Sequence, residues 1–444
     1  MNYRKETVWG WGRWQRRPAF LDRPEWPGEI RLDRYLQDFP RLLARGLGRS
    51  YGDQAMNTEG LLVLATRLNR FLHWDPGKGE LHAEAGADLD RILTFAVPRG
   101  FFPPVTPGTR FVTLGGAVAF DVHGKNQHRD GNFGNHVLGL TLLLPSGEKV
   151  WCSPEENPDL FRATIAGMGL TGIILDVKLR LQPIQSSLVM VQYKPFSALE
   201  EARDIFLAGD QDYPFTVAWL DPGLERGVAT LGRFATKEEA ARAPRPLPVH
   251  APPAKRVPFQ TPAFLLNRLS MALFYKLYYK LQAGRGTRLE RYEKFFYPLD
   301  GIDDWNKLYG RRGFTQYQFV LPMEGGLEAI RRIKEILRKK GCRPCLAVLK
   351  LFGDEGAGIL SFPKKGFTLA MDLPVKKALP AALDEADRVL LEAGGRLYLA
   401  KDARAGAGTI RRMYPRLEEW LAVKKRIDPE GRFSSDLSRR LEIC

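Results

Sequence analysis

The sequence has few cysteines and no metal-binding pattern. Its 444 residues include four cysteines, too few to crosslink a chain of this length: Cys152, Cys342, Cys345 and Cys444. Cys342 and Cys345 form a lone C-x-x-C, but a strand-like run follows it where a thioredoxin-like site would have a helix. The six histidines show no metal-ligand spacing, so no metal is expected.

Long apolar runs are also missing. No stretch of about eighteen apolar residues occurs, so no transmembrane helix is predicted. The N-terminal segment MNYRKETVWGWGRWQRRPAF is charged and lacks the apolar centre of a signal peptide. Arg16-Arg17 is followed by Pro18 and further charges, which does not support twin-arginine export. We expect a cytoplasmic protein, or one that is peripheral at the inner membrane.

Acidic residues are outnumbered. There are 67 basic and 51 acidic residues, a net charge of +16, in a composition that is 44% hydrophobic and 27% charged. The composition is that of a soluble globular protein. The excess charge calls for an anionic partner, namely nucleic acid, an anionic membrane surface or a phosphorylated substrate. No helix-turn-helix, zinc finger or RNA-binding aromatic motif appears, so no nucleic-acid partner is expected.

Glycine-dense loops are the most informative feature that is present. They occupy residues 45–54 and 102–126, and a third glycine-rich run, GMGLTGII, covers residues 167–174. Glycine reaches positive φ and lets an anion approach the backbone without a Cβ in the way. The G-x-G-x-x-G fingerprint and the G-x-x-x-x-G-K-[ST] phosphate loop are both missing. The loops indicate backbone amides presented to a large anionic ligand.

The chain divides into two halves with different patterns. Residues 60–180 alternate short apolar runs with turns, and helices are predicted near 88–97 and 158–166. Beyond 188, strands are predicted at 188–193, 215–220 and 314–321, and helices at 327–339 and 376–393. We predict an α+β protein with a first domain over 1–187 and a second domain, built on an antiparallel sheet with helices, over 188–395. Residues 396–444 are expected to return to the first domain.

Residues 243–294 read as a surface excursion from the second domain. Seven prolines between 243 and 262 exclude a continuous helix or a central strand. The following segment, 264–281, has helical spacing, with a basic stripe of Arg268, Lys276 and Lys280. Its aromatic residues, Phe274, Tyr275, Tyr278 and Tyr279, either pack on the protein's own core or lie among lipid headgroups. The positive charge favours the second interpretation, a membrane-facing segment.

Several longer motifs place the chain near a known family. GLGRSYGD, PGTRFVTLGGAVAFDVHGKN, GNFGNHV and GLTGII follow one another in the order found in the PCMH-type flavin-binding domain of the vanillyl-alcohol-oxidase superfamily. FTQYQFVLP, LKLFG, GGRLYLAKDAR and KKRIDPEGRFSSDLSRRLE extend the resemblance from about residue 8 to the end of the chain. Within the superfamily the chain resembles the enzymes that oxidise polyprenyl-phosphoryl ribose.

The resemblance implies a PCMH-type FAD-binding domain followed by a substrate domain. The residues that it places around FAD are Arg45, Gly46, Leu47, Gly48, Arg49, Ser50, Tyr51, Gly52, Asp53, Gly108, Thr113, Leu114, Gly115, Gly116, Phe120, His123, Gly172, Ile174 and Tyr398. Many relatives attach the flavin to a histidine in the first glycine loop. The corresponding stretch here, Gly48-Arg49-Ser50-Tyr51, has none, so the FAD is expected to be non-covalent.

Three residues are candidates for catalysis. Transfer of a hydride to flavin builds negative charge on the reduced ring, and Lys401 is the candidate to stabilise that charge. The hydroxyl that is oxidised must also lose a proton. His123 can accept a proton near neutral pH, and Tyr51 and Lys401 are alternatives that the sequence does not separate.

The second domain is expected to bind the sugar. The resemblance implies a substrate set of Tyr297, Gln316, Gln318, Lys350, Phe352, Thr368 and Lys401. Gln316 and Gln318 are two residues apart in a strand, so both point to one face. The best-known member of the family has a cysteine where this chain has Ala370 and an asparagine where it has Thr368. The cysteine is not required for hydride transfer, so activity is expected, and the two differences bear on the substrate contacts at that wall.

The leading functional hypothesis is FAD-dependent oxidation of the 2′-hydroxyl of a polyprenyl-phosphoryl-β-D-ribose at a membrane surface. A short-chain reductase would then complete an epimerisation to the arabinose form, for synthesis of a cell-envelope polysaccharide. The alternative is a soluble FAD-dependent sugar, alditol or lactone oxidase of the same superfamily. That alternative gives no role to the basic, aromatic excursion.

Overall fold

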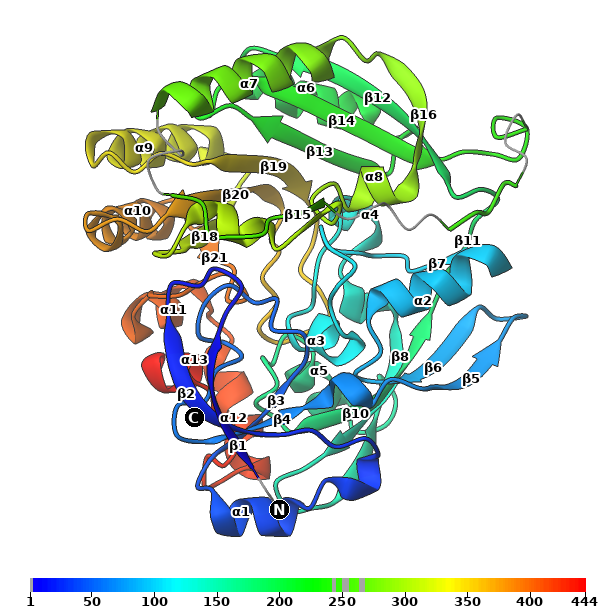
Figure 1. The fold of residues 1–444 in the computed structure, drawn as a ribbon, viewed down its shortest axis with the longest axis vertical. Helices are drawn as coiled ribbons and strands as arrows, with labels where there is room; N and C mark the ends of the chain where they lie inside the picture. The colour runs from blue at the N-terminus through cyan, green and yellow to red at the C-terminus, as the bar shows by residue number, and fades with distance from the viewer. Residues whose placement is uncertain (1–2, 242–244, 250–254, 263–267) are drawn as a thin grey trace.

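The computed structural model describes residues 3–241, 245–249, 255–262 and 268–444. Three larger sheets and their flanking helices form a mixed α+β architecture, which confirms the predicted fold class (Figure 1). The first two sheets use residues before 184, and the third uses residues after 187. Within the described ranges, no helix is both long and apolar enough to cross a bilayer.

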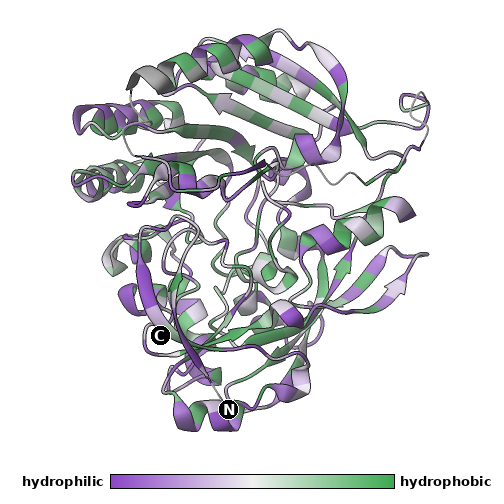
Figure 2. Cartoon of the chain, in the orientation of Figure 1, coloured by the Kyte–Doolittle hydropathy of each residue, from purple (hydrophilic) through white to green (hydrophobic). Residues whose placement is uncertain are grey.

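A four-stranded sheet in the order β1-β2-β4-β3 lies near the N-terminus. Its strands are β1 (Arg4–Trp9), β2 (Arg16–Asp22), β3 (Leu42–Arg45) and β4 (Leu61–Leu64), with helix α1 (Leu32–Asp38) between β2 and β3. All four residues of β4 are buried, and β4 pairs in parallel with β2 and β3. The β1–β2 hairpin is mostly hydrophilic and exposed (Figure 2). The first glycine loop, residues 45–54, begins at the end of β3, so this sheet fixes its start.

A second, fully antiparallel sheet has the order β5-β6-β10-β8-β9. Its strands are β5 (Phe71–Asp75), β6 (Glu80–Glu84), β8 (Val137–Leu143), β9 (Lys149–Cys152) and β10 (Ile173–Arg180). The helices of this part are α2 (Leu89–Ala96), α3 (Leu114–Ala119), α4 (Gln127–Asp130) and α5 (Pro158–Thr164). A short ladder joins β7 (Phe101–Phe102) to β11 (Gln182–Pro183).

The third sheet is antiparallel and has eight strands in the order β16-β12-β14-β13-β19-β20-β18-β21. Its strands are β12 (Leu188–Phe196), β13 (Phe215–Leu220), β14 (Gly227–Phe234), β16 (Thr287–Arg291), β18 (Phe314–Pro322), β19 (Leu346–Phe352), β20 (Gly366–Pro374) and β21 (Arg396–Leu397). Helices α6 (Leu199–Gly209), α9 (Gly326–Lys339) and α10 (Leu379–Glu392) share its core. Tyr317 and Phe319 point from β18 into that core. Gln316 and Gln318 therefore point to the opposite face.

Three helices follow near the C-terminus: α11 (Ala407–Met413) packs on α10 and β21, whereas α12 (Leu417–Ile427) packs on α5 and α13 (Asp436–Arg440) bonds to the backbone of residues 53 and 56. The Trp420 indole N–H donates to the Ala163 carbonyl at 2.8 Å. The Arg440 guanidinium makes two 2.8 Å hydrogen bonds to the Asp53 carboxylate. The division of the chain at residues 187 and 395 stays a prediction, and β21 joins the eight-stranded sheet just beyond the second of these positions.

Helices α7 (Arg268–Ala283) and α8 (Tyr292–Phe296) pack near β12, on the face of the sheet opposite α6, α9 and α10. The prediction that the aromatic face of α7 meets lipid is wrong for Tyr275. This side chain is 3% exposed, stacks on Trp219 of β13 with ring centroids 5.1 Å apart, and donates its hydroxyl to the Cys345 carbonyl. Tyr278 also contacts Trp219, at 4.6 Å between centroids. Trp219 thus offers the tyrosines an aromatic partner within the fold.

The outward face of α7 carries leucines instead. Leu273, Leu277 and Leu281 recur every fourth residue and are 68%, 58% and 58% exposed. Lys276 and Lys280 are exposed beside them. The side chains of Arg268 and Phe274, and residues 242–244, 250–254 and 263–267 of the excursion, lie outside the described residues. Residues 255–262 are exposed or half-buried, and β15 (Lys255–Arg256) pairs there with β17 (Ile302–Asp303). The prediction of a surface excursion is wrong for residues 287–294, because β16 joins the eight-stranded sheet and Tyr292 is buried.

Candidate active site

One large cavity lies between the glycine loops and the face of the eight-stranded sheet that carries Gln316 and Gln318. Its volume of about 980 Å³ is at the upper end of the roughly 300–1,000 Å³ that ligand pockets occupy. Its walls come from residues 44–55, 106–125 and 168–174 on one side and from β13, β18, β19 and β20 on the other. Segments that are distant in the sequence therefore share one chamber.

The glycine loops present polar atoms without partners to this cavity. Gly48 has φ of +65°, and a Cβ on Gly46 would meet the Thr113 Oγ1 at 2.2 Å. A Cβ on Gly108 would meet nothing within 4 Å, so this glycine borders open space. In the described part of the chain, the buried Ser50 Oγ and Arg49 Nε have no hydrogen-bond partner. Buried polar atoms are normally satisfied, so these atoms indicate a ligand that supplies the missing bonds.

Three lysines bring positive charge into the cavity. Burial lowers the pKa of Lys125, Lys350 and Lys401 to about 7 in each case. The Lys125 Nζ lies 4.1 Å from the centre of the Phe295 ring and donates to the Phe295 carbonyl. Loss of water disfavours the charged amine, and an anion bound nearby would reverse this effect. The cavity is therefore built for anionic ligands.

His123 is fixed by contacts to both of its ring nitrogens. Nδ1 is 3.1 Å from the Lys350 Nζ, and Nε2 is 2.9 Å from the side-chain amide of Gln318. A neutral imidazole carries one N–H and one lone pair. When the Lys350 amine is neutral, its lone pair accepts from the Nδ1–H, and Nε2 accepts from the Gln318 N–H as the amide is placed. When Lys350 is charged, it donates to Nδ1 and the imidazole proton moves to Nε2. Burial and the two cations Lys350 and Lys401 hold the pKa of His123 well below its ordinary value.

Lys401 lies over Tyr51 beside a buried carboxylate. Its Nζ is 3.8 Å from the centre of the Tyr51 ring. Beneath them, Asp372 is fully buried and accepts hydrogen bonds from the Gln316 amide at 2.6 Å and the Tyr309 hydroxyl at 3.2 Å. Burial raises the pKa of Asp372 to about 6. Burial and the nearby Asp372 raise the pKa of Tyr51 well above 10. The phenol therefore keeps its proton at neutral pH.

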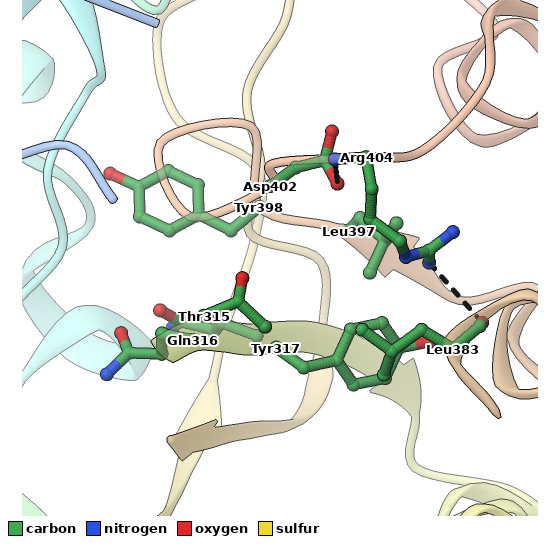
Figure 3. A pocket seen from close by; sticks show the side chains of 9 residues that line it. Thr315, Gln316, Tyr317, Leu383, Leu397, Tyr398, Asp402 and Arg404 are labelled. Carbon is green, nitrogen blue, oxygen red and sulfur yellow. Dashed lines mark hydrogen bonds between the residues drawn. The ribbon is translucent and has the colours of Figure 1, made fainter. Parts of the chain in front are cut away.

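The segment after β21 brings a further aromatic side chain to the cavity. Figure 3 shows Tyr398 above Gln316, while Tyr317 and Arg404 point to the far side, where the Arg404 guanidinium reaches the Leu383 carbonyl at 3.3 Å. The Tyr398 hydroxyl donates to the Phe120 carbonyl at 2.9 Å. Across the cavity, the Tyr297 and Thr106 hydroxyls are 2.6 Å apart. These bonds fix the aromatic walls.

Most of the residues predicted from the sequence border the cavity. Those from the proposed cofactor set are Arg45, Gly46, Leu47, Gly48, Arg49, Ser50, Tyr51, Gly108, Thr113, Gly115, Gly116, Phe120, His123, Gly172, Ile174 and Tyr398. Those from the proposed substrate set are Tyr297, Gln316, Gln318, Lys350 and Lys401. Ala370 also borders the cavity, between Gln318 and Val348 in the strand register.

Five predicted residues lie behind the wall. Asp53 is paired with Arg440, and a Cβ on Gly52 would strike the Asp402 carbonyl at 2.3 Å, so both serve packing with the C-terminal segment. Leu114 is fully buried in the core, because the first turn of α3 faces inward. Phe352 packs against the His123 ring at 4.7 Å. Thr368 is 1% exposed, and its Oγ1 accepts from the Gln318 amide at 3.3 Å. Phe352 and Thr368 thus support side chains that line the cavity.

Sequence reasoning missed Lys125 and Asp372. Lys125 follows His123 by two residues in the same motif, and this proximity was the available signal. Asp372 is a charged residue in an otherwise apolar strand, and it lies opposite Gln316 in the register of β18 and β20. A lone charge in a central strand indicates a buried polar contact. Over the described ranges, no group of histidine, cysteine and acidic residues could hold a metal ion.

Comparisons with known proteins fit this geometry. A family profile for an FAD binding domain matches residues 37–153, and one for D-arabinono-1,4-lactone oxidase matches residues 310–441. A decaprenylphosphoryl-β-D-ribose oxidase of Mycolicibacterium smegmatis is 38% identical over 90% of this chain and 89% of its own length. A Streptomyces coelicolor protein is 33% identical over 80% of this chain and 100% of its own length. An L-gulono-1,4-lactone dehydrogenase of Mycobacterium tuberculosis is 23% identical over 90% of each chain.

The residues present fit FAD. The unpartnered Ser50 Oγ would offer a pyrophosphate a hydrogen-bond donor, and the open side of Gly108 would offer it space. Ile174 and Gly172 border the part of the cavity next to the second sheet, and Lys401 and Tyr398 border the part next to the third. Each glycine at these positions lets the ligand approach the backbone.

We predict that the FAD is bound without a covalent bond. The first glycine loop has no histidine or cysteine, and both ring nitrogens of His123 are engaged by Gln318 and Lys350. Acid precipitation of the purified protein should release all of the flavin absorbance to the supernatant. Flavin that stays with the precipitate after washing in denaturant would contradict the prediction.

Proposed function

The chain belongs to the decaprenylphosphoryl-β-D-ribose oxidase family of FAD-dependent oxidoreductases that act on CH–OH groups, and on that premise we propose that it oxidises the 2′-hydroxyl of a polyprenyl-phosphoryl-β-D-ribose. The product would be the 2′-keto sugar. A short-chain reductase would then reduce the ketone from the other face, which gives the arabinose form used in cell-envelope polysaccharide.

The observation that carries the proposal is the charge of the sugar-side wall. Lys125 and Lys350 border the cavity together with the hydrogen-bonding side chains Gln316, Gln318 and Tyr297. The amides and the phenol suit sugar hydroxyls, and the two amines suit a phosphoryl group. A neutral lactone or free sugar would bring no anion to these amines, of which Lys125 has the carboxylate of Glu290 nearby. A phosphorylated sugar therefore fits this wall better than the substrates of a lactone oxidase.

FAD, when bound, supplies the two-electron acceptor for a hydride from C2′ of the ribose. The chain must accept the hydroxyl proton, and the contacts favour Lys401 for this role. Both nitrogens of His123 are engaged, and Tyr51 keeps its own proton. The pKa of Lys401 is about 7, so its neutral amine is populated near neutral pH. On accepting the proton, Nζ becomes an ammonium as negative charge builds beside it.

The other residues hold the reacting groups in place. His123 orients Lys350 and Gln318, and Thr368 holds the Gln318 amide from behind. Asp372 accepts from Gln316 and lies close enough to Lys401 to favour its charged form. Such positioning lowers the entropy that must be lost when the substrate reaches its reactive geometry.

The outward face of α7 supports docking on an anionic membrane. Leu273, Leu277 and Leu281 form an exposed apolar ridge, and Lys276 and Lys280 lie beside it. Such a ridge inserts among lipid headgroups while the lysines meet anionic lipid. A substrate with a polyprenyl chain resides in a membrane, so a peripheral enzyme would meet it there.

Substrate specificity should be visible in anaerobic bleaching of the flavin. A polyprenyl-phosphoryl-β-D-ribose should bleach the holoenzyme, because its phosphoryl group pairs with Lys125 and Lys350. An alkyl riboside without phosphate and L-gulono-1,4-lactone should bleach it at least about 100-fold more slowly, since loss of one charge-assisted contact alone costs on the order of 1.5–3 kcal/mol. Equal or faster bleaching by the lactone would contradict the proposed function.

Lys401 should set the pH dependence of flavin reduction. Because the neutral amine accepts the proton, the single-turnover rate should rise as pH increases through about 7 and then level off. Lys401→Ala should lower the rate by about 100-fold or more, on the order of 3 kcal/mol, with full FAD content. Lys401→Arg keeps a positive charge but accepts no proton, so it should be slow at every pH.

The matched control Lys339→Ala, on the exposed end of α9, should behave as wild type. A rate that falls above pH 7, or a fast Lys401→Arg variant, would remove Lys401 as proton acceptor.

Membrane binding should depend on the ridge and the lysines of α7. The protein should float with anionic vesicles more than with neutral vesicles, and added salt should weaken the binding. The double variant Lys276→Glu, Lys280→Glu should lose roughly 1 kcal/mol or more per position, and Leu277→Gln should weaken binding to both kinds of vesicle. The control Leu207→Gln changes a leucine that is 55% exposed on α6 and should have no effect. Flotation that is equal for both lipids, or unchanged in the α7 variants, would reject this surface.

A further inference from the structure

On the face of the eight-stranded sheet that borders the cavity, a row of apolar side chains crosses neighbouring strands and starts at the sugar wall. Strand register places Gln318 opposite Ala370, Ala370 opposite Val348, Val348 opposite Trp219, and Trp219 opposite Val228. All five side chains border the cavity. Neighbouring strands lie about 4.8 Å apart, so the row extends roughly 19 Å across the sheet.

The side chains of this row are less covered by other parts of the protein than those on the opposite face of the sheet. The opposite face is filled by α6, α9 and α10, whereas Val348 and Ala370 are only half-buried and face open cavity. Half-buried apolar side chains that line a cavity favour an apolar ligand, because covering them removes their surface from water. The row is polar only at its first member, Gln318, which contacts His123.

Helix α7 roofs the far end of the row. Tyr278 contacts Trp219, and Tyr278 and Gln282 border the same cavity from above. The other side of α7 presents the exposed leucines Leu273, Leu277 and Leu281. The helix thus separates the end of the apolar row from an apolar outer surface. A long apolar chain that runs along the row would emerge beside the surface that the proposed function assigns to the membrane.

We propose that the row Ala370–Val348–Trp219–Val228 binds the first isoprene units of the substrate's lipid chain. The proposal rests on the proposed function and adds a subsite to it. The ribose lies at Gln316 and Gln318, the phosphoryl group at Lys125 and Lys350, and the chain continues along the row beneath α7. Charged and apolar ends of one cavity then match charged and apolar ends of one ligand.

The subsite predicts a preference for chain length. Each buried methylene improves binding roughly fourfold, so covering only part of a farnesyl chain gives a large gain. We expect kcat/KM for farnesylphosphoryl-β-D-ribose to exceed that for ethylphosphoryl-β-D-ribose by at least about 100-fold. The measurement is single-turnover flavin reduction by holoenzyme in detergent-free buffer, at concentrations where both esters are monomeric.

A blocking variant locates the effect. Val348→Trp fills the middle of the row and should lower kcat/KM for the farnesyl ester to within about tenfold of the ethyl ester. The ratio of the two esters is the readout, and the flavin absorbance of the purified variant shows that it is folded and holds FAD. The matched control Val348→Ile keeps an apolar side chain of similar size and should retain the full preference.

The outcomes separate this subsite from the function on which it rests. Equal kcat/KM for the two esters in the wild type would overturn the subsite and leave the proposed function in place. A Val348→Trp variant that loses both esters equally, or neither, would also overturn it. If neither ester bleaches the flavin while an unphosphorylated sugar or lactone does, the proposed function fails and the subsite fails with it.

Discussion

The burial of positive charge in one cavity governs the arrangement of this protein. Lys125, Lys350 and Lys401 are half-buried at the cavity wall, and partial removal from water lowers the pKa of each to about 7. A buried cation is stable only when it is neutralised, paired or matched by a bound anion. The pyrophosphate of FAD and the phosphoryl group of the proposed substrate are anions of this kind. The free protein is thus prepared for anionic ligands, and the proposed phosphoryl group would restore the charge on Lys125 and Lys350.

Two halves of the chain must meet for this cavity to exist. The first glycine loop follows β3 of the first sheet and the run at 167–174 leads into β10 of the second, whereas the sugar wall belongs to the third sheet. The segment that carries Lys401 connects them, since the Tyr51 N–H donates to the Ala400 carbonyl at 3.1 Å and the Tyr398 N–H donates to the Gln318 carbonyl at 2.9 Å. The Arg440–Asp53 pair holds the end of the chain against the first glycine loop. These backbone and ion-pair contacts fix Lys401 between the loops and the sheet.

Local patterns predicted much of this arrangement. The alternation in β18 placed Tyr317 and Phe319 in the core and the two glutamines on the other face, because a strand has a period of two. Contacts between residues that are far apart in the sequence could not be predicted from such local patterns. Nothing near Asp53 indicates Arg440, which is 387 residues away, and nothing in α7 indicates that Trp219 of β13 receives Tyr275. Likewise, the role of Asp372 as a hydrogen-bond acceptor depends on Gln316 and Tyr309, which are distant from it in the sequence.

Proton uptake on ligand binding tests the central claim most directly. If Lys125 and Lys350 are partly neutral in the holoenzyme and become charged beside a phosphorylated sugar, while Lys401 stays neutral to accept the hydroxyl proton, binding must draw protons from solution at a pH above the pKa of these two lysines. Calorimetric titration of holoenzyme with ethylphosphoryl-β-D-ribose, in buffers of different ionisation enthalpy, measures this uptake. We predict net proton uptake at pH 8 that declines towards pH 6, where the lysines are already charged. Binding with no proton uptake at pH 8, or with proton release, would contradict the account.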